Sequence, residues 1–222
     1  MKVVNPSVEI LDPLDGQEIL KRIERAGRTA YRSEDRITDT SAAGFVKMLI
    51  GRGHESVLEH EKITVRVVCD RGVSHELVRH RIASYTQEST RYCDYSRGKF
   101  GSEITVVLPA WWADCYDCEG QRITAAGGQN KPFLVWLQAC KSAESAYMRL
   151  RELGLSPQQA RNVLPHSLKT EIVATMNLRQ WRHFLKLRTQ RDVHPQMRQV
   201  AAAILNELKR HIPVVFDDIE VQ

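Results

Sequence analysis

Arg79-His80-Arg81-Ile82-Ala83-Ser84-Tyr85-Thr86-Gln87-Glu88-Ser89-Thr90-Arg91-Tyr92 is the most informative segment of the chain. Its arginines alternate with hydroxyl and amide side chains, and it contains no lysine. A guanidinium is a planar fork of donors that suits phosphate and stays charged at any working pH. Hydroxyl and amide groups add neutral donors and acceptors that recognise the edge of a ring. The segment therefore predicts a site for a phosphorylated heteroaromatic small molecule rather than a solvated basic surface.

Length and composition predict one globular domain spanning residues 1–222. The chain has 42% hydrophobic and 27% charged residues, which is typical of a soluble protein with a sizeable core. The net charge is +5, from 32 basic and 27 acidic residues. This excess is modest and forms no polybasic block, so it favours anionic metabolites over wrapped nucleic acid.

The N-terminal residues, the lack of a long apolar run and the cysteines predict a cytoplasmic protein. Residues 1–6 lack the apolar core of a secretion signal, and no apolar run is long enough to span a membrane. Five cysteines, an odd number, predict free thiols in a reducing compartment. Cys115 and Cys118 have the spacing of half a zinc site, but nothing completes it, so no metal is predicted.

Hydrophobic periodicity predicts more helices than strands, without regular alternation, which favours an α+β fold over a doubly wound sheet. Helices are expected at 16–31, 40–50, 72–80, 132–153, 156–165, 178–187 and 195–210, and strands at 63–68, 104–108 and 170–176. Residues 113–131, rich in Gly and Asp, are expected to form a loop or an insertion.

Three other segments carry candidate functional residues. Residues 54–60 hold two His and two Glu, without the i, i+4 spacing of a zinc helix, so they also fit a polar corner between helix and strand. Arg161 alone would be an ordinary surface residue. In 177–188, Arg179 and His183 fall on one helical face; an amphipathic helix with a basic outer face is the alternative. A helix starting after Asn177 would also offer N–H groups to an anion.

The motif Arg79-His80-Arg81, followed after seven residues by Ser89, resembles the signature of the flavin-dependent thymidylate synthases. Ser84 and Arg91 also stand where the fuller pattern of that family expects them. Further resemblance lies in 54–60, 161–165 and 177–188.

The resemblance implies a single mixed domain of helices and antiparallel sheet. It implies methylation of dUMP at C5 to give dTMP, with carbon from 5,10-methylenetetrahydrofolate and reducing equivalents from NADPH through FAD. The family resemblance also implies a homotetramer with active sites between subunits, which needs no nucleic acid and no membrane.

The resemblance also assigns residues. Arg188 would be catalytic, polarising the uracil ring. FAD would contact Ser56, Arg79, His80, Arg81, Gln87, Asn177, Leu178, Arg179 and His183. The substrate dUMP would contact Glu76, Arg79, Gln87, Glu88, Ser89, Thr90, Arg91, Arg161 and Arg188. Glu76 departs from the Gln that the family usually has there.

Other interpretations remain open at this point. Ser89 would be a nucleophile if His80 acted as its base, although the resemblance implies phosphate binding instead. Cys93 would be a stronger nucleophile, but it is outside the pattern and is expected to be a small buried residue. A nucleic-acid-binding protein using Trp111 and Trp112 would lack every usual motif. A flavoprotein with a different substrate is suggested only by Glu76.

Overall fold

The structure, a computed structural model, describes residues 1–98 and 101–222. Its contacts divide these residues into two compact units. Unit 1 is formed by Met1–Ser7, Val67–Arg79 and Thr86–Ile172, and unit 2 by Val8–Arg66, His80–Tyr85 and Val173–Gln222. The segment 79–92 thus contributes residues to both units, and the single domain expected for 1–222 stays a prediction.

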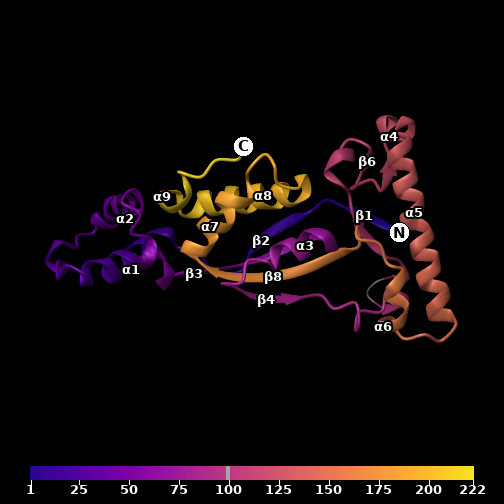
Figure 1. The fold of residues 1–222 in the computed structure, drawn as a ribbon, viewed down its shortest axis with the longest axis horizontal. Helices are drawn as coiled ribbons and strands as arrows, with labels where there is room; N and C mark the ends of the chain where they lie inside the picture. The colour runs from indigo at the N-terminus through magenta and orange to yellow at the C-terminus, as the bar shows by residue number, and fades with distance from the viewer. Residues whose placement is uncertain (99–100) are drawn as a thin grey trace. The chain divides into compact units, whose positions relative to one another are not determined.

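Unit 1 is organised by its long helix α5 (Lys131–Glu152) (Figure 1). The helix begins at Asn130, whose side chain accepts a hydrogen bond from the Phe133 amide at 3.0 Å, and Pro132 lies in the first turn, where a missing N–H costs nothing. Its buried face joins Phe133, Leu137, Cys140 and Tyr147 to the core. That core also contains Val3, Tyr95, Ile104, Val106, Leu108, Cys115, Ala160 and Leu168.

Short elements complete unit 1. They are β1 (Lys2–Val4), α3 (Arg71–Leu77), β5 (Thr105–Val107), η4 (Ala110–Trp112), α6 (Pro157–Ala160) and η5 (Arg161–Val163). Strands β1 and β5 pair in parallel, and α3 is capped by the Asp70 carboxylate, which accepts from the Val73 amide at 2.8 Å. The helices expected at 72–80, 132–153 and 156–165 are confirmed within a few residues of their ends.

Residues 113–131 are expected to form a loop or an insertion. The insertion stays a prediction, and the loop is wrong in part, because the segment contains short strands and a helix between turns. It contains the antiparallel pair β6 (Tyr116–Asp117) and β7 (Arg122–Ile123), followed by α4 (Ala125–Gln129). One glycine that suggested a loop, Gly127, serves close packing instead: a Cβ there would lie 2.0 Å from the Cys115 carbonyl oxygen. The Thr124 hydroxyl caps α4 by accepting from the Gly127 amide at 3.1 Å.

Unit 2 is mainly helical. Its helices are α1 (Gly16–Thr29), η1 (Glu34–Arg36), α2 (Ser41–Gly51), η2 (Glu55–His60), α7 (Leu178–Arg188), α8 (Pro195–His211) and α9 (Pro213–Phe216). Helix α1 packs on α2, and α7 packs on η2 and α8. Trp181 and Phe184 of α7 are fully buried in edge-to-face contact, and the Trp181 indole donates to the Ile63 carbonyl at 2.9 Å.

A four-stranded sheet has the order β2-β3-β8-β4. Its strands are β2 (Ser7–Ile10), β3 (Lys62–Asp70), β4 (Ser84–Gln87) and β8 (Lys169–Asn177). Along β8 every second residue from Thr170 to Met176 is buried, the alternation of a strand with one buried face. The predicted α+β class is confirmed, although β1 and β5 depart from the antiparallel pairing that the resemblance implied. Within residues 1–98 and 101–222, no helix has the length and apolar character needed to cross a membrane.

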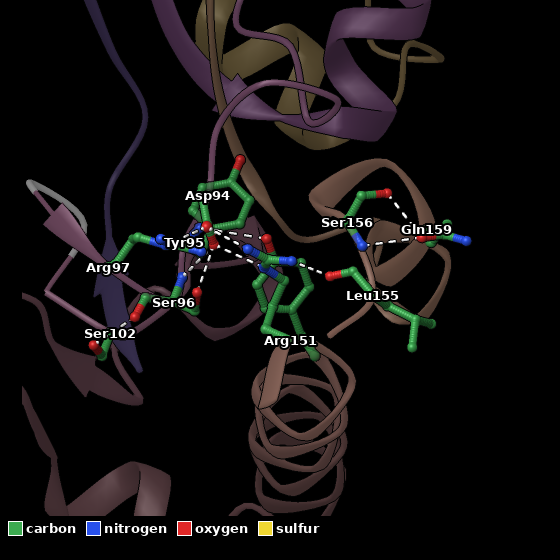
Figure 2. A network of polar contacts seen from close by, with 10 residues as sticks. Asp94, Tyr95, Ser96, Arg97, Ser102, Arg151, Leu155, Ser156 and Gln159 are labelled. Carbon is green, nitrogen blue, oxygen red and sulfur yellow. Dashed lines mark hydrogen bonds and ion pairs between the residues drawn. The ribbon is translucent and has the colours of Figure 1, made fainter. Parts of the chain in front are cut away.

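One carboxylate, Asp94, joins the end of α5 to the segment that follows Tyr92 (Figure 2). Arg151 binds it with both arms of its fork, at 3.0 and 2.7 Å, and also donates to the Leu155 carbonyl. Ser96 donates to the same carboxylate from its amide and its hydroxyl. The exposed Arg97 side chain donates to it through Nε. The hydrogen bonds from Arg151 are the largest influence holding the pKa of Asp94 well below its usual range.

We expect Arg151→Met to lower the free energy of unfolding by about 1.5–3 kcal/mol, because it removes a bidentate charged partner from a largely buried carboxylate. The matched control is Arg97→Met: Arg97 pairs with the same carboxylate but is 74% exposed, so its loss should cost less than about 1 kcal/mol. Urea denaturation of both variants at pH 7 measures the difference. Equal effects would refute a structural role for the Asp94–Arg151 pair.

The same pair predicts acid sensitivity. Because the folded-state pKa of Asp94 is lowered from 3.8, its contribution is complete above the unfolded pKa and is lost as pH falls below it towards the folded value. Asp94→Asn should therefore lose less stability than the wild type between pH 5 and the acid limit of the urea titration.

Candidate active site

The helix α7 is positioned by the strand before it. Asn177 ends β8, and its side chain accepts from the Gln180 amide at 2.8 Å, so it caps the first turn of α7. The apolar side of the helix, including Trp181 and Leu185, is buried. Its polar side is therefore held in a fixed orientation.

A cavity of about 510 Å³ in unit 2 lies against this polar side. Its lining comes from η2, from the residue after Arg81 and from α7: Glu55, Glu59, Ile82, Asn177, Arg179, Gln180, His183 and Lys186. The volume is in the range of small-molecule sites. Arg179 and His183 both line the cavity, so the prediction that they share one helical face is confirmed.

Charges of both signs surround the cavity. Arg179 donates to the Glu59 carboxylate at 2.6 Å, and both side chains are about half exposed. Glu55 accepts from the buried Arg182, and Lys186 lies 3.7 Å from the same Glu55 oxygen. An exposed ion pair such as Arg179–Glu59 contributes little free energy. Arg179 is therefore able to leave the Glu59 carboxylate and bind another anion instead.

His80 and Arg188 meet in unit 2 although they lie 108 positions apart in the sequence. The Arg188 Nε donates to His80 Nε2 at 3.0 Å. The His80 ring also contacts the edge of Phe184, with centroids 4.9 Å apart, and lies 6.2 Å from the His183 ring. The signature and the end of α7 are thus joined by a polar contact.

The environment of His80 keeps its imidazole neutral. Burial is the main cause, and the charge of Arg188 and the neighbouring His183 add to it, so the pKa of His80 falls to about 4. A neutral ring leaves Nε2 as an acceptor for Arg188 and places the proton on Nδ1. At pH 7 the neutral His80 ring therefore orients Arg188 through a hydrogen bond and does not repel its positive charge.

Unit 1 holds the other half of the predicted site, around the turn Ser89–Arg91. The Ser89 hydroxyl accepts from the Arg91 amide at 3.3 Å, and the Ser89 carbonyl accepts from the Cys93 amide at 2.9 Å. Arg161 donates to the Thr90 hydroxyl at 3.2 Å, and the Arg91 Nε donates to Gln158 at 2.9 Å. Two arginines and two hydroxyls are thereby gathered at one turn, an arrangement that suits phosphate oxygens.

Hydrogen bonds also fix the residues that precede this turn. Gln87 donates to the Ser74 and Thr170 hydroxyls at 2.9 and 3.2 Å. Glu76 lies in α3, and Arg79 follows the end of that helix, with its amide donating to the Glu76 carbonyl at 3.2 Å. The expected position of Arg79 near a helix end is confirmed.

The structure brings together only part of each predicted set. Ser56 and Arg81 are exposed and do not line the cavity, although Ser56 lies in η2 beside Glu55. Leu178 is fully buried, and its amide donates to the Glu61 carbonyl at 3.0 Å, so its side chain belongs to the core. Arg79 and Gln87, assigned to FAD, belong to unit 1, whereas the cavity belongs to unit 2.

Sequence reasoning missed five residues that line the cavity: Glu55, Glu59, Ile82, Gln180 and Lys186. The helical period carried a signal for one of them, Lys186, which lies three positions after His183 and seven after Arg179. A second hollow in unit 2, of about 340 Å³, was also not predicted. Its lining is Arg28, Tyr31, Ser33, Arg36, Phe45, Met48, Leu49, Arg52 and His54.

The structure gives little support to the alternative interpretations, which were a serine or cysteine nucleophile and nucleic-acid binding. Cys93 is half-buried against the core of unit 1 rather than fully buried as expected. Ser89 belongs to unit 1 and His80 to unit 2. Trp112 packs against Trp136 and Phe133 in the core, which leaves Trp111 as the exposed member of the pair. Across residues 1–98 and 101–222, no group of three or more His, Cys, Asp or Glu is placed to hold a metal ion.

Comparison with known proteins identifies the family. The profile of the family described as thymidylate synthase complementing protein matches residues 14–214. A flavin-dependent thymidylate synthase of Mycobacterium avium (strain 104) is 35% identical over 226 residues, covering 97% of this chain and 85% of the relative. One from Thermococcus kodakarensis is 35% identical over 179 residues, covering 79% of this chain and 66% of the relative.

Among solved structures, a UMP/dUMP methylase, PolB of Streptomyces cacaoi, bound with 5-Br dUMP, is similar with a TM-score of 0.76 and 26% identity. The match covers 98% of this chain and 96% of the methylase chain. The chain therefore belongs to the flavin-dependent thymidylate synthase family. The family predicted from the signature is confirmed, and so is the prediction of a methyltransferase enzyme.

The contact between Arg188 and His80 predicts a shifted titration. Arg188→Met should raise the pKa of His80 from about 4, but leave it below 6.5, because burial is the larger cause and persists. The His80 ring resonances in an NMR titration of wild type and variant measure this. An unchanged His80 pKa in the variant would exclude the charge of Arg188 as a cause.

The sign of the accompanying effect on stability follows from the lowered pKa. His80 contributes stability above its unfolded pKa near 6.5, and this is lost as pH falls through the window from 6.5 to about 4. Arg188→Met should narrow that pH window from its lower end, because it raises the folded-state pKa of His80 and leaves the unfolded pKa unchanged.

Proposed function

We propose that this protein is an FAD-dependent thymidylate synthase that converts dUMP to dTMP, using 5,10-methylenetetrahydrofolate as carbon donor and NADPH as reductant. The observation that carries the proposal is the 3.0 Å hydrogen bond between His80 of the signature and Arg188 at the end of α7. This bond joins two segments that each resemble the family, the signature and residues 177–188. It involves Arg188, the residue expected to act on the substrate. Family membership supports the same reaction.

The cavity in unit 2 fits part of a flavin nucleotide. Arg179, Lys186 and His183 supply donors for a pyrophosphate, and Asn177 and Gln180 supply amide groups for a ring edge. The full set that the resemblance assigns to FAD is Ser56, Arg79, His80, Arg81, Gln87, Asn177, Leu178, Arg179 and His183, and of these Asn177, Arg179 and His183 line the cavity. When bound, the flavin supplies hydride transfer, which no side chain can perform.

The turn in unit 1 fits the phosphate of dUMP. Ser89, Thr90, Arg91 and Arg161 supply two hydroxyls and two guanidiniums, held by hydrogen bonds among themselves and to Gln158. The full proposed set adds Glu76, Arg79, Gln87, Glu88 and Arg188. Arginine suits this task because its fork binds phosphate at two points.

Arg188 is the proposed catalytic residue. Its guanidinium would lie beside N3 and O2 of the uracil ring and stabilise the negative charge that develops there as C5 becomes nucleophilic. Neutral His80 holds the guanidinium through Nε and, being uncharged, does not itself neutralise the positive charge of Arg188. The protein thus orients the charge before the substrate arrives.

A second candidate is the same reaction on UMP. The similar solved structure is a UMP/dUMP methylase, and Glu76 replaces the usual Gln of the family. Parallel assays with UMP and dUMP discriminate between the two: the proposed function requires turnover of dUMP.

Arg188→Ala should keep its fold and FAD but lose turnover by about 10²–10³, because one charge-stabilising donor is removed. Arg188→Lys should restore little, since a point charge does not reproduce the planar fork. Tritium release from [5-³H]dUMP, with NADPH and the folate present and then each omitted, measures this. Melting temperature and the visible flavin spectrum are read on the same preparations.

The matched control is Arg210→Ala, since Arg210 is 72% exposed on α8 and pairs only with nearby Glu207 among the described residues. If Arg188 only favours the dipole at the end of α7, its loss would cost about 0.3–1 kcal/mol of stability and leave the rate unchanged. Near wild-type tritium release from Arg188→Ala would end the catalytic assignment. Release that needs neither NADPH nor the folate would contradict the proposed reaction.

Assembly is the remaining part of the proposal: a cytoplasmic homotetramer with active sites built between subunits. Mixing Arg161→Ala, altered in unit 1, with Arg179→Ala, altered in unit 2, should restore part of the activity that each has lost. Sedimentation of the wild type should give four times the mass of one chain, 25.4 kDa. A fully active monomer at assay concentration would rule out this assembly.

A further inference from the structure

A partly buried charged cluster lies directly before the turn Ser89–Arg91. The Glu88 carboxylate accepts from the Tyr95 hydroxyl at 3.0 Å on one oxygen and from Lys169 Nζ at 3.0 Å on the other. The side chains of Glu88 and Lys169 are 14% and 19% exposed. Both carboxylate oxygens of Glu88 are therefore engaged by protein donors.

The backbone of Glu88 is held as well. Its amide donates to the Glu171 carbonyl at 2.8 Å, and its carbonyl accepts from Arg71 Nη1 at 3.3 Å. Arg71 also reaches the Thr170 hydroxyl at 3.4 Å. Four hydrogen bonds from β8, α3 and Tyr95 thus fix the residue that precedes Ser89.

The charges in this cluster are balanced. Lys169 bridges two carboxylates, with Glu171 at 2.6 Å and Glu88 at 3.0 Å, and Arg71 lies at the Glu88 carbonyl. Burial lowers the pKa of Lys169, and the hydrogen bonds to Glu171 and Glu88 raise it, with a net rise, so the ammonium stays charged. An uncompensated carboxylate next to Ser89 would repel a phosphate, and Lys169 cancels that repulsion.

We propose that Lys169, with Tyr95, is a positioning residue for substrate binding: it holds the Glu88 carboxylate away from dUMP and fixes the turn Ser89–Arg91 in the form that receives the phosphate. This inference revises one member of the proposed dUMP set: Glu88 acts by anchoring the turn, and its carboxylate, already bound by Tyr95 and Lys169, makes no contact with substrate. This inference rests on the proposed binding of dUMP at that turn.

The test compares Lys169→Met, Glu88→Gln and the double variant by calorimetric titration of dUMP into the FAD-loaded protein. Lys169→Met should weaken dUMP binding about ten- to hundredfold, the range expected when one hydrogen bond to a charged group is lost. The double variant should bind dUMP more tightly than Lys169→Met, because removing both partners leaves no unpaired carboxylate. A purely additive loss would overturn the inference.

A kinetic readout separates positioning from stability. Lys169→Met should raise the KM for dUMP while kcat changes little, since the contacts to the reacting ring remain. A lower melting temperature with unchanged dUMP affinity would show a merely structural role and overturn the inference. Tyr95→Phe removes a single oxygen from the cluster, so it should weaken dUMP binding in the same direction even if Lys169→Met does not fold.

The matched control is Lys141→Met, an exposed lysine of α5 in the same unit, which should leave dUMP binding unchanged. If the wild type binds no dUMP, the proposed function fails and the inference fails with it. If the wild type binds dUMP and Lys169→Met binds it equally well, the inference alone fails.

Discussion

A buried cation, Arg182, fixes the walls of the cavity in unit 2. Its guanidinium is 1% exposed and donates to Glu55 of η2, to Asp218 after α9 and to the Val215 carbonyl. A buried charge is tolerated only when its donors are satisfied, so η2, α7 and the segment after α9 must all be in place together. The two cavity walls that come from η2 and α7 are therefore joined below the surface by one side chain.

The sequence predicted the larger helices because they follow a strong period. Helices α5 and α8 show apolar residues at helical spacing, an N-terminal Pro and polar ends, and the structure has both. The short strands β1, β2 and β4 could not be predicted, because three or four residues carry no usable period and depend on partners far along the chain. The loop expected at 113–131 was partly wrong for a related reason: Gly127 allows close packing against the Cys115 carbonyl, which composition cannot distinguish from a turn.

The candidate site was predictable where chemistry and spacing were combined in one motif. The face shared by Arg179 and His183 followed from helix geometry alone. The partners of Glu88 did not, since Tyr95 and Lys169 reach it from positions 7 and 81 residues away. The burial of Arg182 did not follow either, because the composition of a basic helix does not show which of its arginines is buried. Long-range ion pairs decide which charges of a basic segment face a ligand, and one sequence does not reveal them.

The length of helix α7 sets the distance between Asn177 and Arg188. It runs from Leu178, just after the cavity residue Asn177, to Arg188, and spans about 16 Å at 1.5 Å per residue. A substitution on its outer face changes one group, but a single inserted or deleted residue would turn Arg188 by about 100° relative to Asn177 and separate it from His80. The length of this helix is therefore under tighter constraint than most of its individual residues, and the spacing between the cavity and His80 is a property of the backbone.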